Sequence, residues 1–134
     1  MSRLSLAFFG TGGLMVMVGM VWGSMMGASG DHSLAPAHAH LNLVGWASLG
    51  LMGAFYGIAG DRAPRRLGWI NYALSSLGVV VMVPSLAVLL GGDESVLPFM
   101  MVAEVLVMAG MVSFLLVILL TARNRASNSA SVKI

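Results

Sequence analysis

Residues 96–121 read VLPFMMVAEVLVMAGMVSFLLVILLT, and this stretch decides the fold. Its one charged side chain is Glu104. A helix needs about 20 consecutive apolar residues to cross the hydrocarbon core of a bilayer, and this stretch is longer than that. The sequence therefore predicts a transmembrane α-helix here.

Three further apolar stretches precede this one in the chain. They cover residues 6–27, 37–60 and 67–90. Each is long enough for a membrane-spanning helix at about 1.5 Å per residue. We therefore expect an all-α membrane protein with four transmembrane helices in residues 1–122. The Ser- and Asn-rich segment 123–134 is expected to be a disordered cytoplasmic tail.

Composition agrees with lipid as the main solvent of this chain. Of its 134 residues, 58% are hydrophobic and only 9% are charged. Soluble domains carry about 25% charged residues, which a polar surface requires. The absence of cysteine excludes disulfides and thiolate metal sites. The lipid bilayer is thus an expected partner, and nucleic acid is not.

The basic residues predict how the chain crosses the membrane. All seven fall on one side of the predicted spans: Arg3, Arg62, Arg65, Arg66, Arg123, Arg125 and Lys133. The connections on the other side hold Asp31, Asp93 and Glu94. Loops rich in Arg and Lys stay in the cytoplasm. We therefore expect a multi-pass protein of the bacterial inner membrane with both termini cytoplasmic and the histidines near the periplasmic side.

All the histidines of the chain lie close together, at positions 32, 38 and 40. Pro36 suits the first turn of a helix, which places His38 and His40 at the start of the second span. Residues two apart on an α-helix point about 200° away from each other, so one helix face cannot offer both rings to one ion. The spacing predicts two different sites, one on each side of the helix.

Two interpretations of these histidines stay open. They are amphipathic residues wetted at the membrane interface, or they are ligands, because neutral imidazole binds haem iron, copper and zinc well. Ionisable residues inside membrane spans are functional by default, which favours ligands.

The run Ala-His38-Ala-His40-Leu-Asn-Leu-Val-Gly resembles the Ala-His-Phe-His segment of haem–copper oxidase catalytic subunits. It is also similar to related membrane proteins of nitric-oxide metabolism. In the oxidase segment the first histidine ligates the high-spin haem and the second the low-spin haem. That segment opens a helix that runs inward from the outer face, as the second span does here.

The resemblance implies an assembly. The oxidase subunit resembles three four-helix units around a pseudo-threefold axis, and this chain corresponds to one unit. A homotrimer would imitate the oxidase core, with His38 of one subunit facing His40 of the next. The resemblance thus implies membrane b-type haem sites between subunits, with both histidines as axial iron ligands.

The departures from the oxidase pattern limit the expected chemistry. The oxidases use three more histidines for copper and a tyrosine linked to one of them, whereas this chain has only His32 to spare. We expect electron transfer or haem binding, with an unknown redox partner, and no oxygen reduction. One alternative is a non-haem protein in which copies of His32, or of a span-two histidine, hold zinc or copper on the threefold axis. Another is a non-catalytic accessory subunit.

Other polar residues lie within the predicted spans. Glu104 is interpreted as an outer-shell partner of a ligand histidine, as a proton-uptake group, or as a helix-to-helix or interfacial group. Asn42 and Trp46 follow His38 on its helix face, so Asn42 is expected to bond a propionate or a backbone carbonyl and Trp46 to stack on a porphyrin.

The glycine repeats 19-23-27 and 53-57 predict close helix packing. Polar residues near the start of the third span predict hydrogen bonds between helices: Asn71, Ser75 and Ser76.

Overall fold

The computed structural model describes residues 1–131, with side chains as far as residue 124. The described part of the chain is helical and contains no strand. Four helices in it are long and apolar enough to cross a membrane: Arg3–Ser29, Ala35–Arg62, Arg65–Leu90 and Glu94–Asn124. The expected all-α fold with four membrane-spanning helices is confirmed, and the expected homotrimer is taken up below as a proposal.

The second of these spans is built from three helical types in succession. They are α2 (Ala35–His40), the π-helical η1 (Leu41–Ala47) and α3 (Ser48–Ala59). The other spans are α1 (Arg3–Ser29), α4 (Arg65–Leu90) and α5 (Leu97–Ser131). Two short 3₁₀ turns, η2 (Gly60–Arg62) and η3 (Glu94–Val96), connect them.

Local sequence explains where these helices start and stop. The hydroxyl of Ser2 accepts a hydrogen bond from the Ser5 amide at 3.1 Å and caps α1. Gly30 ends α1 with a φ of 71°, a left-handed conformation that glycine adopts without a steric cost. Pro36 lies in the first turn of α2, where its missing N–H is not needed.

The last helix is longer than the sequence pattern predicted. The apolar stretch ends at Thr121, yet α5 continues to Ser131. Residues 121–131 contain neither Gly nor Pro, so nothing in the backbone stops the helical hydrogen bonding. The predicted disordered tail therefore overlaps the helix over residues 123–131, and its remainder, 132–134, lies outside the described residues.

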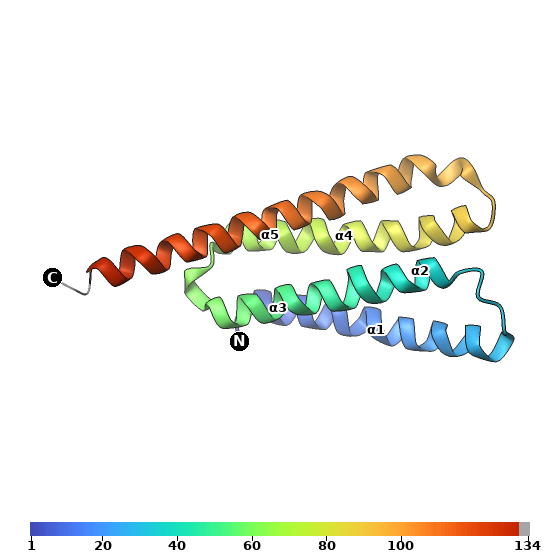
Figure 1. The fold of residues 1–134 in the computed structure, drawn as a ribbon, viewed down its shortest axis with the longest axis horizontal. Helices are drawn as coiled ribbons and strands as arrows, with labels where there is room; N and C mark the ends of the chain where they lie inside the picture. Colours follow the sequence, from blue (N-terminus) through green and yellow to red (C-terminus); the bar gives the residue numbers. More distant parts are fainter. Residues whose placement is uncertain (132–134) are drawn as a thin grey trace.

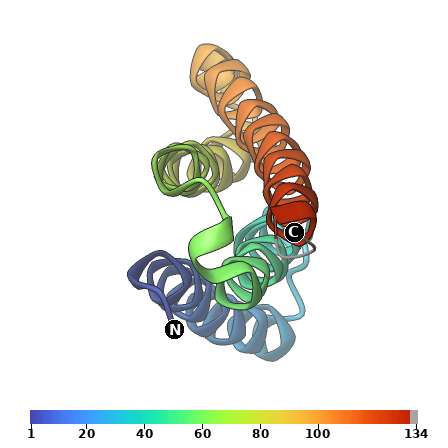
Figure 2. The same ribbon diagram turned by 90° about the vertical axis from the view of Figure 1, so that its left-hand side faces the viewer.

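The spans form two antiparallel pairs that pack side by side, α1 with the α2–η1–α3 span and α4 with α5 (Figure 1). We call the end with the connections 30–34 and 91–96 the histidine end. The opposite end, with the chain start and residues 60–64, is the arginine end. Figures 1 and 2 show α5 diverging from α2 toward the histidine end. The α5 helix is consequently the span that the rest of the chain covers least.

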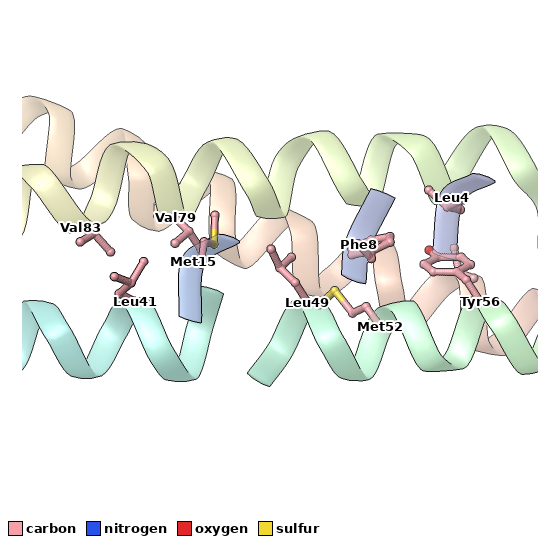
Figure 3. Packing of buried hydrophobic residues seen from close by; sticks show 10 residues of the cluster. Leu4, Phe8, Met15, Leu41, Leu49, Met52, Tyr56, Val79 and Val83 are labelled. Carbon is pink, nitrogen blue, oxygen red and sulfur yellow. The ribbon is translucent and has the colours of Figure 1, made fainter. Parts of the chain in front are cut away.

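The apolar core runs the length of the bundle. Figure 3 shows it extending from Val83 and Leu41 near the histidine end to Leu4 and Tyr56 near the arginine end. Phe8 is fully buried and stacks on the Tyr56 ring with 5.2 Å between centroids. The tyrosine and the histidines therefore occupy opposite ends of the molecule.

A buried polar seam joins three of the spans. The Tyr56 hydroxyl donates to Asn71 Oδ1 at 3.0 Å, and Asn71 Nδ2 donates to the Gly110 carbonyl oxygen at 2.8 Å. Asn71 thus links α3, α4 and α5, as expected for a polar residue between membrane helices. Ser75 lies beside it, with its Oγ 3.3 Å from Asn71 Nδ2. The Ser76 hydroxyl is buried without a hydrogen-bond partner, so it does not link helices as the sequence suggested.

Candidate functional site

The His38 side chain faces α1. Its Nε2 lies 2.9 Å from the Gly19 carbonyl oxygen, and a Cβ added at Gly23 would come within 3.0 Å of the same nitrogen. The ring of Trp22 meets the imidazole edge to face, with 6.1 Å between centroids. His38 is therefore half-buried in a recess of α1 that exists because residues 19 and 23 lack side chains.

The ring of His40 turns back onto its own helix. Its Nδ1 lies 2.8 Å from the Pro36 carbonyl oxygen. A carbonyl oxygen only accepts, so the neutral ring carries its hydrogen on Nδ1. This leaves the lone pair on Nε2, which is the arrangement of a metal-binding histidine whose other nitrogen is fixed by a backbone carbonyl.

Asn42 lies against His38, as the sequence predicted. Its Nδ2 donates to the His38 carbonyl oxygen at 2.9 Å and lies 3.1 Å from the ring Nε2. Because Gly19 also offers a carbonyl oxygen, Nε2 carries the ring hydrogen and cannot accept from Asn42 at the same time. The carbonyl bond is thus the one that Asn42 makes, and the site in this state is fully internal to one chain.

The π-helical η1 segment follows the histidines directly. The Ser48 hydroxyl donates to the Leu43 carbonyl oxygen at 2.8 Å, five residues back in the chain. In an α-helix, residues four apart drift by about 40° around the axis, and the wider π turn reduces this drift. Short π segments in α-helices are frequent at functional sites.

One consequence of the π segment is that three side chains stay in line on α1. His38 lies at Gly23, Asn42 at Gly19, and Trp46 at Gly12, where an added Cβ would come within 3.3 Å of the indole. Trp46 was expected on the His38 face, and the structure places it there on the same neighbouring helix. Its side chain is 37% exposed.

Sequence reasoning missed the α1 half of this site. The glycine repeat at 19, 23 and 27 was recognised as a packing signal, but its partners were not. Gly27 has nothing within 4 Å of an added Cβ, so the repeat is used at 19 and 23 only. No link between Trp22 and the histidines was predicted from the sequence, yet the Trp22 ring contacts His38.

Two other candidates lie apart from this cluster. His32 is exposed in the 30–34 connection, where its Nδ1 lies 3.0 Å from the Gly30 carbonyl oxygen. Glu104 is exposed on α5, and its carboxylate has no hydrogen-bond partner among residues 1–124. Its carboxylate lies on the outward face of the helix among apolar neighbours such as Met101, Val105 and Met108.

The described residues of one chain contain no group of three or more His, Cys, Asp or Glu side chains placed to hold one metal ion. His38 contacts α1 and His40 bonds back to α2, so one chain presents its two imidazoles to different neighbours. A comparison with protein-family models, with curated proteins and with solved structures gives no match for this chain.

Proposed function

We propose that this chain is a membrane b-type haem protein that works as a homotrimer, with haem iron held between His38 of one copy and His40 of the next. The observation that carries the proposal is the His40 ring, whose Nδ1 bond to the Pro36 carbonyl leaves Nε2 as the ligand nitrogen. A π segment begins at the next residue, and because such segments are frequent at functional sites, it supports a functional role for this helix.

The donor set fits haem iron only with a second chain. His38 and His40 lie two residues apart in the α-helical turn of α2, so they point away from each other. One copy then offers one ring to each of two sites. The Nε2 atom of His40 already carries the lone pair that would bind iron. The His38 ring would first have to leave the Gly19 carbonyl oxygen.

The chemistry that fits this set is electron transfer or haem binding. Iron with histidine on both axial positions has no open position for a gas, which favours one-electron exchange. The chain supplies only one histidine beyond these two, His32, and that residue lies in a connection. Oxygen reduction at a haem–copper pair therefore has no donor set here.

Two features support an assembly larger than one chain. The α5 helix is covered little by its own chain, and it carries Glu104 outward in the middle of an apolar face. A charged side chain facing lipid costs about 2.5–3.5 kcal/mol on insertion scales. A neighbouring copy that covers α5 and donates a hydrogen bond to the Glu104 carboxylate removes that cost.

The proposed setting is a bacterial inner membrane with the arginine end in the cytoplasm. All seven Arg and Lys residues belong to that end of the sequence pattern. The histidine end then faces the periplasm, and both termini are cytoplasmic.

The test is an absorption spectrum of protein purified from cells supplied with haem, together with its mass in detergent. We expect a low-spin haem spectrum, a trimer mass, and loss of haem in His38→Ala and in His40→Ala. His32→Ala is the matched control and is expected to keep the haem. A colourless preparation from haem-replete cells overturns the proposal. Stoichiometric zinc or copper without porphyrin points to the non-haem alternative.

Co-expression of the two variants tests where the ligands come from. If each site takes one ring from each of two copies, His38→Ala and His40→Ala chains together restore haem that neither restores alone. Random mixing in equal amounts leaves about one quarter of the interfaces with both rings. Two ligands from one chain predict no recovery at all.

A further inference from the structure

A cavity of about 300 Å³ opens at the arginine end, far from the histidines. Figure 2 looks onto this end and shows the start of α1, the 60–64 connection and the start of α4 around one region. Arg3 and Arg65 both line the cavity, with Asp61 between the second and third spans. Leu4, Tyr56 and Trp69 form its apolar part.

The two guanidinium groups are not neutralised within the chain. Among residues 1–124, neither the Arg3 nor the Arg65 guanidinium has a hydrogen-bond or ion-pair partner. Asp61 is the one carboxylate in the lining. Two cations against one anion leave the cavity positive, and guanidinium forks match the oxygens of a phosphate group.

The backbone adds to this positive field. Both α1 and α4 begin at the cavity, at Arg3 and Arg65, so the positive ends of two helix dipoles meet there. Ser2 caps the first of these helices, whereas α4 has no side-chain cap. These dipoles reinforce a site that the two unpaired arginines already define.

We propose that this cavity binds the phosphate group of an anionic ligand. The apolar lining and the half-exposed indole of Trp69, 38% accessible, suit a ligand whose phosphate is attached to something lipid-like. An anionic phospholipid headgroup and a free phosphate share the recognised chemistry, and the experiment separates them. The inference does not depend on haem binding.

The experiment is a native mass-spectrometry titration of the full chain in detergent with phosphatidylglycerol, with phosphatidylcholine, and with inorganic phosphate. We expect phosphatidylglycerol to bind at least tenfold more tightly than phosphatidylcholine. The Arg3→Gln/Arg65→Gln variant is expected to lose this preference, and each single variant to lose part of it. Circular dichroism checks the helical content, and the single variants carry the test if the double variant does not fold.

Arg66→Gln is the matched control, because Arg66 follows Arg65 on α4 but does not line the cavity. It is expected to change binding by less than twofold. If Arg66→Gln loses as much binding of phosphatidylglycerol as the cavity variants, the attraction is general to the surface and the proposed site is wrong. The proposal is also wrong if the parent chain prefers neither anionic lipid nor phosphate. Arginine-dependent binding of phosphate that competes with the lipid identifies a soluble ligand; binding of the lipid alone identifies the headgroup.

Discussion

The imidazole of His38 and the backbone of Gly19 are in direct contact, with Nε2 2.9 Å from the glycine carbonyl oxygen. The contact ties the start of the second span to the middle of the first. It depends on α1 having no side chain on the face that receives His38 and Asn42.

Gly19→Ala is expected to destabilise the bundle. The added Cβ would lie 2.6 Å from Asn42 Oδ1, so the Asn42 amide must shift and its bond to the His38 carbonyl oxygen is disturbed. Overpacking of this kind costs about 1–3 kcal/mol. Gly27→Ala, whose Cβ meets nothing within 4 Å, is the control and gains up to about 1 kcal/mol from helix propensity. Thermal unfolding in detergent measures both, and equal melting temperatures would contradict the packing described here.

Asn71→Ala is expected to lower stability by removing the bonds to Tyr56 and to Gly110. Hydrogen bonds between membrane helices contribute about 0.6 kcal/mol on average and up to about 1.7 kcal/mol. Ser76→Ala removes a buried hydroxyl that has no hydrogen-bond partner, so the free energy of unfolding should stay the same or rise slightly. Denaturant unfolding of the two variants side by side decides the point, and a larger loss in Ser76→Ala would refute the hydrogen-bond assignment.

Asp31 and Asp93, in the two connections of the histidine end, are expected to titrate below the ordinary carboxyl pKa of 3.8. The Ser33 backbone amide lowers the pKa of Asp31 most, whereas the Ser95 hydroxyl lowers the pKa of Asp93 most. With a pKa lowered by folding, each carboxylate supports its turn above the unfolded pKa, and this support is lost as the pH falls through the folded pKa.

Carbon-13 NMR of labelled aspartate measures these two pKa values. Ser95→Ala should raise the pKa of Asp93, and Ser33→Ala the pKa of Asp31, because in each variant only the backbone bond to the carboxylate survives. An unchanged pKa in either variant would show that the serine hydroxyl does not contact that carboxylate.

Glu104→Leu is expected to weaken the proposed trimer. If a neighbouring copy donates a hydrogen bond to this exposed carboxylate, the leucine variant loses it and dissociates at lower detergent concentration. Met108→Leu, one turn along on the same exposed face, is the control and should leave the mass unchanged. A Glu104→Leu oligomer as stable as the parent would place this face against lipid.

Much of the fold was predictable because lipid imposes a simple rule. Long apolar runs must be helices when backbone groups have no water to bond, so the four spans follow from hydropathy. The end of α5 was not predictable in the same way, since hydropathy falls at Thr121 while the backbone has no reason to stop. The interhelical role of Asn71 was expected, but its particular partners depend on how the spans pack.

The candidate site was half predictable. The i, i+2 spacing of His38 and His40 gave their divergence, and the i, i+4 spacing gave the Asn42 contact. The α1 half came from the packing of two spans, so Trp22 and Gly19 could not be assigned as neighbours of His38 beforehand. The π segment could not be predicted from the sequence either, because LNLVGWA contains no residue that requires a π-helix.

The π segment sets the direction of His38 and His40 relative to α3, because it changes how far the helix turns between positions 41 and 47. The wider π turn holds one more residue than the α-helical turn that it replaces, so a regular α-helix over the same residues would rotate the preceding turn of helix by about 100° relative to α3. His38 would then leave its recess on α1 without any change in the sequence. Exchanging π for α hydrogen bonds in this segment is therefore enough to aim these imidazoles at a different neighbour.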